Sequence, residues 1–150
     1  MRKAILTTSC LVLAACTEPT ASSQEAVLER RAEWVARELV DYSVTFRQDG
    51  FFNAVGGRSW RLGVTGGVVR TAVEVGTGVA FPDPTANGFL SVTQLFDWAV
   101  QLAANDRLEA ITYDRTLGYP TLIQISGPPD ASGTITLSNL ERTTSGSALR

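Results

Sequence analysis

Asp114 and Tyr119 are the two residues whose types and spacing come closest to a catalytic pair. A carboxylate beside a phenol can transfer protons if burial shifts the pKa values of the two groups. The same stretch also suits a structural turn, because Asp accepts hydrogen bonds from nearby amides, Gly118 allows a positive φ and Pro120 forces an extended residue before it. We favour the turn, since Asp and Gly are ordinary turn residues.

The residue types that are absent exclude most other catalytic chemistry. The chain has no histidine, which rules out a Ser-His-Asp triad, a Cys-His pair and an imidazole metal ligand. Asp83 and Asp130 stand beside prolines as turn residues do, and no acidic spacing matches a calcium loop. Residues 63–67 have no lysine for a phosphate loop. We expect no metal and no cofactor, and we interpret Trp60 and Trp98 as core or partly buried residues rather than a ligand wall.

The first sixteen residues have the layout of a lipoprotein secretion signal. A basic start at residues 1–3 precedes a short apolar run at 4–13, and Leu13 to Cys16 (Leu-Ala-Ala-Cys) resembles the lipobox of bacterial lipoproteins. The apolar run is shorter than the about 20 residues that a membrane helix needs. The resemblance implies cleavage before Cys16, a diacylglyceryl thioether on its sulfur and an amino terminus acylated by a fatty acid such as palmitate. The alternative is a plain secreted protein that is cut after Cys16.

Lipidation of Cys16 would determine where the protein resides. Two or more acyl chains hold a protein stably on a membrane, whereas one chain holds it only marginally. Residues 16–23 are then the lipidated cysteine and a polar tether, of which residues 17–22 reach at most about 20 Å. Thr17, rather than Asp, follows the cysteine. By resemblance to the usual sorting signal, this favours the periplasmic face of the outer membrane if the host has two membranes.

The composition of the mature chain fits one ordinary domain. Removal of residues 1–15 leaves 135 residues, enough for one sizeable core, with 11 arginines against 15 acidic residues and a net charge of −4. An acidic chain without a basic stripe is a poor nucleic-acid binder. Because only Cys16 remains, no intramolecular disulfide and no free thiol nucleophile are expected.

A first helix is predicted over about residues 24–41. Ser22 and Glu25 form a capping box at its start, and Glu33 and Arg37 suit an i, i+4 ion pair on its exposed face. The helix period predicts a buried stripe of Val27, Leu28, Val35 and Leu39, with Trp34 on its flank.

Two strands with a tight turn between them should follow a first strand at 42–47. Apolar residues alternate in 42–47 and again in 59–65, which is the period of a half-buried strand. Gly66-Gly67 suits a two-residue hairpin turn, because both central positions can take φ > 0. The expected pairs are Val64 with Val69, Leu62 with Thr71, and Trp60 with Val73.

The second helix has the clearest start signal in the chain. Ser91 and Gln94 form a capping box, Leu90 and Leu95 form a hydrophobic staple, and Asn105 suits a left-handed stop. The expected inner stripe contains Val92, Leu95, Phe96, Ala99, Leu102 and Ala103. Three more strands are predicted over about 108–113, 121–126 and 134–140.

These elements predict an α+β fold in the order α-β-β-β-α-β-β-β. Short connections make neighbouring strands antiparallel, so we expect two helices packed on one face of a mainly antiparallel sheet. The domain would cover residues 24–141, after the signal at 1–15 and the tether at 16–23. Residues 142–150 lose periodicity and are predicted to be a disordered tail.

The long loop at 76–89 carries Phe81 and Phe89, with Pro82 and Pro84 between them. Loops of this length are often functional or mobile. Apolar loop residues more often cover a sheet edge or fill the margin of a core, and we favour that interpretation.

Several short motifs together indicate a family. Trp34, Tyr42, Leu95-Phe96, Tyr113-Asp114 and Gly118-Tyr119-Pro120 occur in this order. The chain thereby resembles a family of small bacterial lipoproteins and secreted proteins that is catalogued only as a domain of unknown function. The resemblance covers about residues 29–140 and is sharpest over 113–120. Many relatives carry Cys-x-Cys near the end of the first strand. This chain has Gly50-Phe51-Phe52 there, so it cannot share any role that these cysteines have in the relatives. The resemblance implies no activity, substrate or catalytic residue.

We therefore expect a lipid-anchored cell-envelope protein whose domain binds rather than catalyses. Its partners would be the membrane, through Cys16, and an envelope protein, but not nucleic acid. The candidate partner-binding residues are Phe81, Phe89, Asp114 and Tyr119. Two alternatives stay open: a small hydrolase that uses carboxylates such as Asp114, and an inhibitor-like module that inserts loop 76–89 into a target enzyme.

Overall fold

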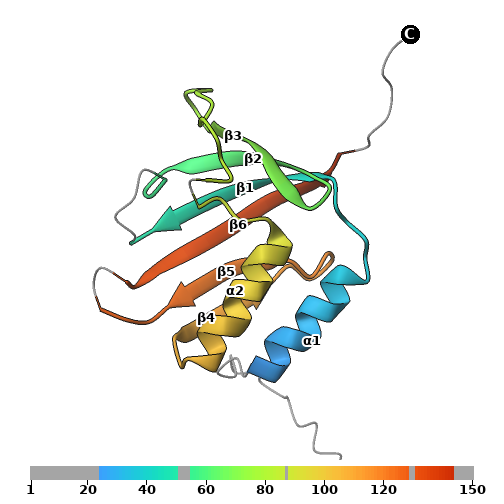
Figure 1. Cartoon of the computed structure of the whole chain (residues 1–150), viewed down its shortest axis with the longest axis vertical. Helices are drawn as coiled ribbons and strands as arrows, with labels where there is room; N and C mark the ends of the chain where they lie inside the picture. The colour runs from blue at the N-terminus through green and yellow to red at the C-terminus, as the bar shows by residue number, and fades with distance from the viewer. Residues whose placement is uncertain (1–23, 51–54, 87, 129–130, 144–150) are drawn as a thin grey trace, which may run out of the picture.

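A computed structural model describes residues 24–50, 55–86, 88–128 and 131–143, and the predicted signal, tether and capping residue Ser22 lie outside these ranges. The α+β prediction and its element order are confirmed (Figure 1). The elements are α1 (Gln24–Val35), β1 (Tyr42–Asp49), β2 (Ser59–Thr65), β3 (Val68–Glu74), α2 (Val92–Ala104), β4 (Leu108–Tyr113), β5 (Pro120–Ile125) and β6 (Gly133–Arg142). The last strand thus includes Arg142, which the sequence analysis places in the tail.

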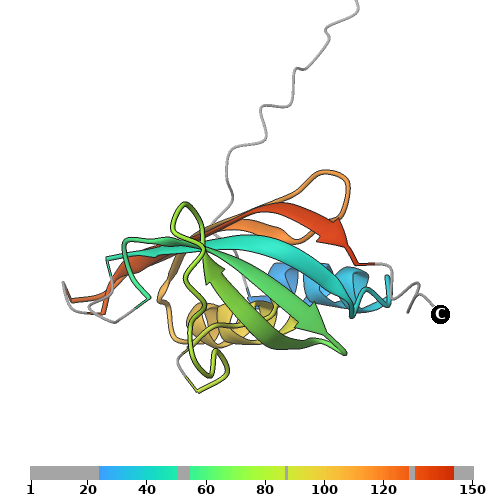
Figure 2. The same ribbon diagram turned by 90° about the horizontal axis from the view of Figure 1, so that it is seen from above.

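The strands form one antiparallel sheet in the order β3-β2-β1-β6-β5-β4. Each half of the chain contributes a helix followed by a three-stranded meander, and the pairing of β1 with β6 joins the halves at the centre. Both helices lie on the same face of the sheet (Figure 2), as predicted. The opposite face carries polar side chains of β1 and β6, such as Ser43, Thr45 and Thr136, which alternate with the buried residues.

The predicted β2–β3 hairpin is present, but the predicted register is wrong beyond the first pair of residues. Gly66 and Gly67 have φ values of 59° and 77°, and Val64 faces Val69 as expected. Beyond that pair a bulge shifts the register, so Leu62 faces Ala72 and Trp60 faces Glu74. The extra residue turns apolar Ala72 inward and leaves Thr71 exposed.

Gly63 explains why the bulge fits at this point. The hydroxyl of Thr71 occupies the space that a Cβ on Gly63 would need, so a larger residue at Gly63 would collide with β3. Because Gly63 has no side chain, β3 can approach β2 closely at Thr71.

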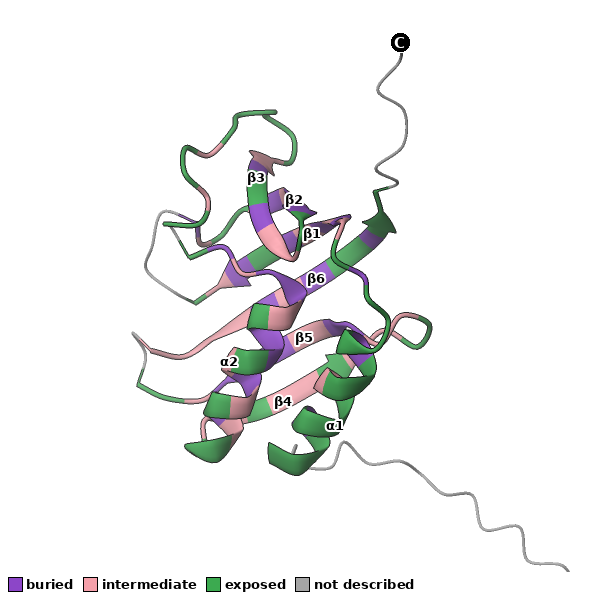
Figure 3. Ribbon diagram, turned by 45° about the vertical axis from the view of Figure 1, so that its right-hand side comes forward, coloured by how far each residue is buried: buried purple, intermediate pink, exposed green. Residues whose placement is uncertain are grey.

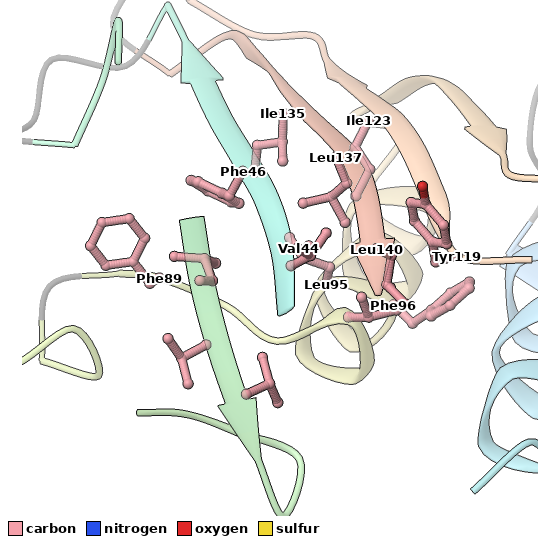
Figure 4. Close-up of a cluster of buried hydrophobic side chains, with 14 of the residues drawn as sticks. Val44, Phe46, Phe89, Leu95, Phe96, Tyr119, Ile123, Ile135, Leu137 and Leu140 are labelled. Carbon is pink, nitrogen blue, oxygen red and sulfur yellow. The ribbon is translucent and has the colours of Figure 1, made fainter. Parts of the chain in front are cut away.

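The core fills the space between the sheet and α2 (Figure 4). Aliphatic and aromatic side chains from β1, β5 and β6 meet those of α2, and α1 adds Val27 and Trp34 at its side. The side chains of Val44, Phe46, Leu95, Phe96, Ile123, Ile135 and Leu137 are at most 2% exposed. The described residues contain no cysteine, so this part of the chain depends on such a core for its stability.

The first helix is shorter than predicted and buries a different stripe. It ends at Val35 rather than near residue 41, and Glu38 has a left-handed φ of 51°. Leu28 and Val35, which were expected to be buried, are 46% and 48% exposed. Most of α1 is exposed (Figure 3). The reason is that α1 packs mainly along α2, so only the narrow edge with Val27 and Trp34 is covered.

The predicted ion pair of α1 is also wrong. The carboxylate of Glu33 pairs with Arg30, at 2.8 Å from Oε2 to Nη1, and not with Arg37. Because the helix has ended, Arg37 no longer lies one turn above Glu33.

The start of α2 is as predicted, and its end differs by one residue. Ser91 Oγ accepts from Gln94 N at 3.5 Å, and Gln94 Oε1 accepts from Ser91 N at 2.9 Å, which completes the capping box. Asn105 has a φ of −110°, and the left-handed residue is Asp106, with φ 54°. All of the predicted inner stripe is buried except Ala103, which is half-buried.

Tyr42 predicts a loss of stability at alkaline pH. Its hydroxyl accepts from Val92 N at 2.8 Å in the first turn of α2, and burial raises the pKa of Tyr42 to about 12. The unfolded chain ionises this phenol from about pH 10 while the folded chain keeps it protonated. The free energy of unfolding should therefore fall by about 3 kcal/mol between pH 10 and pH 12 on account of Tyr42.

Urea unfolding followed by tryptophan fluorescence from pH 8 to pH 12 measures this effect. Because burial also raises the pKa of Tyr113 to about 12, the decisive quantity is the difference between the wild type and Tyr42→Phe. Tyr42→Phe should be less stable at pH 8 by about 1–3 kcal/mol, since Val92 N loses its acceptor, but should lose less with rising pH. An equal alkaline slope in both proteins would refute the assignment.

Candidate functional site

A cleft of about 390 Å³ lies between the C-terminal part of α1 and the turn that joins β4 to β5. In Figures 1 and 3 this turn lies beside the C-terminal end of α1. Charged residues predominate in the lining, which consists of Arg30, Glu33, Arg37, Tyr113, Asp114, Arg115 and Gly118. We call this site the arginine cleft.

The β4–β5 turn forms one wall of the cleft, and hydrogen bonds to Asp114 hold this turn in place, as predicted. Its Oδ1 accepts from Thr116 N at 2.9 Å and from Leu117 N at 2.7 Å. Gly118 takes a φ of 74°, and its N–H donates to the carbonyl oxygen of Asp114 at 3.0 Å. The turn interpretation is therefore confirmed, and two backbone amides of the turn hold the carboxylate in place.

Tyr119 does not form a reacting pair with Asp114. Its side chain is 5% exposed and lies on the core side of the turn, near Leu140 (Figure 4). Burial raises the pKa of Tyr119, the charge of Asp114 raises it further, and a hydrogen bond with the backbone of Leu140 opposes both. Tyr119 is absent from the lining of the arginine cleft. Tyr119 packs on the core side of the turn, while Asp114 holds the turn through hydrogen bonds with its amides.

Tyr113 forms an uncharged aromatic wall of the cleft. Its ring stacks on Phe96, with centroids 6.0 Å apart and planes at 13°, and the guanidinium of Arg30 lies 5.6 Å from the ring centroid. Burial raises the pKa of Tyr113 to about 12, although the charge of Arg30 opposes the rise. The phenol is therefore neutral at physiological pH and adds no negative charge to the cleft.

Two arginines of the cleft have free guanidinium groups. Within the described ranges, the side chains of Arg37 and Arg115 make no hydrogen bond and no ion pair. Arg37 lies over the turn, because a methyl group on Gly118 would be 3.8 Å from its Nη2. Arg30, by contrast, is held by Glu33. The cleft thus presents two unpaired cations, whereas both of its carboxylates already have partners.

A known protein family includes the arginine cleft and the domain around it. A family model described as a family of unknown function (DUF6174) matches residues 26–142. The chain belongs to this family. The match runs from the first turn of α1 to the end of β6, so it covers the whole DUF6174 domain seen in the structure, including the arginine cleft. No curated protein and no solved structure matches the chain.

The other two candidate residues lie far from the cleft, in the core margin of the DUF6174 domain. Phe89 is 2% exposed, and its ring packs against Phe46, Trp60 and Phe81 at centroid distances of 5.3–5.7 Å. Phe81 is half-buried in the same cluster. The favoured interpretation of these two residues, as filling of the core margin, agrees with this packing. An inhibitor-like loop with Phe89 at a projecting tip does not.

The remaining candidates of the sequence analysis have structural roles or lie apart. Asp83 accepts from Thr85 Oγ1 at 2.9 Å within its own turn, whereas Asp130 lies outside the described residues. Trp60 is buried and donates to Val55 O, while Trp98 lines a separate hollow of about 360 Å³ on α2, so the two do not form one wall. The described part of the domain holds no cluster of three metal-ligating side chains and no helix long and apolar enough to cross a membrane.

Asp114→Ala should destabilise the DUF6174 domain by about 1–3 kcal/mol, because two turn amides lose their acceptor. Asp114→Asn keeps an acceptor oxygen and should cost less than half of that amount. Thermal unfolding of the two variants measures the order. Equal destabilisation by Ala and Asn would show that the negative charge, rather than the turn hydrogen bonds, is what the fold requires.

Proposed function

We propose that the chain is a lipid-anchored protein of the cell envelope whose domain binds a ligand at the arginine cleft without transforming it. The anchor is inferred from Leu13 to Cys16, which resemble a lipobox. A diacylated or triacylated Cys16 would stay on its membrane, and the short tether would keep α1 close to the lipid surface.

The observation that supports binding is that the two carboxylates of the arginine cleft have partners, whereas two of its arginines have none among the described residues. Arg37 and Arg115 have no side-chain partner among the residues that the structure describes, and such cations in a hollow are available to an incoming anion. Glu33 and Asp114 accept hydrogen bonds from a guanidinium and from backbone amides. Both carboxylates are therefore already engaged in hydrogen bonds, which leaves the two arginines as the groups available to a ligand.

Photo-crosslinking in the native envelope tests this proposal. A photoreactive phenylalanine at Thr116, which is exposed on the turn beside the cleft, should capture one adduct of defined mass. The matched control is the same residue at Thr71, which is exposed on β3 away from the cleft. Equal adducts at both positions, or none at Thr116, would contradict a binding site at the cleft.

A small hydrolase remains the second candidate, because Glu33 and Asp114 line the same cleft. It predicts turnover of an ester or glycoside by the purified chain, with loss of at least about a hundredfold in rate in Asp114→Asn. Turnover of a small molecule, together with failure to capture any partner, would favour this candidate over binding.

A further inference from the structure

We propose that the arginine cleft binds a phosphate monoester or diester group, carried by a lipid headgroup or by a soluble metabolite. The inference rests on the proposed function, since it names the ligand class of the same site. Its basis is the convergence of Arg30, Arg37 and Arg115 on one hollow with a neutral aromatic wall.

The arginine cleft has more cationic than anionic side chains in its lining. The whole chain has 13 basic against 15 acidic residues, so a hollow with more arginines than carboxylates runs against the average of the surface. Arginine stays protonated at all physiological pH values. Asp114 already accepts hydrogen bonds from two backbone amides, and Tyr113 is a neutral phenol. The uncompensated charge at Arg37 and Arg115 is therefore positive and permanent.

The three arginines reach the cleft from different segments of the chain. Arg30 belongs to α1, Arg37 to the turn after it, and Arg115 to the turn between β4 and β5. Each guanidinium offers a rigid fork of N–H donors. A phosphate has several acceptor oxygens around one centre and, as a monoester, a charge of about −1.5 to −2 at pH 7. A carboxylate has two oxygens in one plane and a single charge, so it engages fewer of the three arginines.

Glu33 can compete with a bound phosphate for Arg30, because it forms an ion pair with this arginine. Its pair with Arg30 is 2.8 Å long, with the two side chains 47% and 51% exposed. Ion pairs as exposed as this contribute little to stability and open readily. An incoming phosphate can therefore take Arg30 from Glu33, which would add the third cation to the two that are already free.

The test uses the full chain, expressed with its own signal and purified in a zwitterionic detergent. Arginine side-chain N–H resonances are followed by NMR during titration with glycerol 3-phosphate, and separately with nanodiscs of phosphatidylcholine with or without phosphatidylglycerol. Acetate at matched ionic strength is the carboxylate comparison. We expect saturable shifts with glycerol 3-phosphate, with phosphatidylglycerol or with both, and affinity for acetate at least about fivefold weaker.

Variants of opposite sign keep the test specific. Arg37→Glu and Arg115→Glu should each weaken phosphate binding about tenfold or more, because each removes charge-assisted hydrogen bonds. Glu33→Gln should strengthen binding about two- to fivefold by removing the competitor of Arg30. The matched control is Arg70→Glu, since Arg70 is exposed on β3, outside the cleft and without an ion pair in the described ranges. It should change affinity by less than about twofold. Thermal unfolding verifies that each variant is folded.

The outcomes separate the two sources and the two proposals. Binding of glycerol 3-phosphate alone would identify a soluble ligand, and binding of phosphatidylglycerol nanodiscs alone would identify a lipid headgroup; either supports the proposal. No saturable shift with any phosphate, equal shifts with acetate, or no effect of Glu33→Gln and Arg37→Glu would overturn it. Captured protein at Thr116 together with no phosphate binding would support the proposed function and refute this deeper inference. The mass of the same preparation reports lipidation of Cys16 independently.

Discussion

Replacement of Phe89 by alanine is expected to lower the free energy of unfolding by about 3–5 kcal/mol, the usual cost of removing a buried aromatic ring. The ring is 2% exposed and makes edge contacts with Phe46, Trp60 and Phe81. Its removal would leave a cavity where the loop before α2 closes one end of the core. Urea unfolding, followed by tryptophan fluorescence, measures the effect.

The matched control for Phe89 is Val79→Ala in the same loop. Val79 is 59% exposed, so its truncation should change the free energy of unfolding by less than about 0.5 kcal/mol. If Phe89→Ala were as mild as Val79→Ala, Phe89 would not be a core residue, and a role of this loop in binding a partner would regain support.

Cys16→Ser is expected to abolish lipidation completely. A hydroxyl in place of the thiol cannot accept the diacylglyceryl group, so metabolic labelling with an alkyne-bearing palmitate should fall to background. Cleavage before residue 16 should also fail, which leaves a precursor larger by residues 1–15. Gel fluorescence and intact mass measure the two effects.

The matched control for Cys16 is Cys10→Ser. Cys10 lacks the aliphatic residue three places before it that a lipobox has, since Thr7 stands there. Labelling and cleavage should therefore match the wild type. Labelling that persists in Cys16→Ser, or that is lost in Cys10→Ser, would place the modification elsewhere and remove the basis of the anchor.

Local signals explain why much of the fold could be predicted from the sequence. The capping box of Ser91 and Gln94 marks the start of α2, and the paired glycines 66 and 67 mark a hairpin turn. Both depend on residues within a few positions of one another, so the chain carries the information in one place. Strict alternation in β1 and β2 likewise reveals which face is buried.

Predictions failed where a distant segment decides the outcome. Leu28 and Val35 have the spacing of a buried stripe, but they are exposed because α1 packs along α2 by a narrow edge. The register beyond Val64 depends on the contact of Gly63 with Thr71 across the hairpin, which an ideal two-residue pairing ignores. Tertiary packing overrides local pattern in both cases.

Only part of the candidate site could be predicted from the sequence, for the same reason. The turn at Asp114 is local, and its hydrogen bonds follow the expected chemistry. The arginine cleft is not local: Arg37 and Arg115 are 78 positions apart and meet only when the β4–β5 turn reaches the end of α1. In the sequence the arginines of α1 resemble an ordinary solvated helix face, and only the position of Arg115 directly after Tyr113-Asp114 hints at a shared site.

Lipidation of Cys16 can be measured by mass spectrometry of the amino-terminal peptide, taken from the protein extracted from its native membrane. We predict that the peptide begins at Cys16 and carries a diacylglyceryl group, with or without a further amide-linked fatty acid. An unmodified Cys16, or a mature chain that begins at another residue, would contradict it and leave the arginine cleft on a protein that diffuses freely.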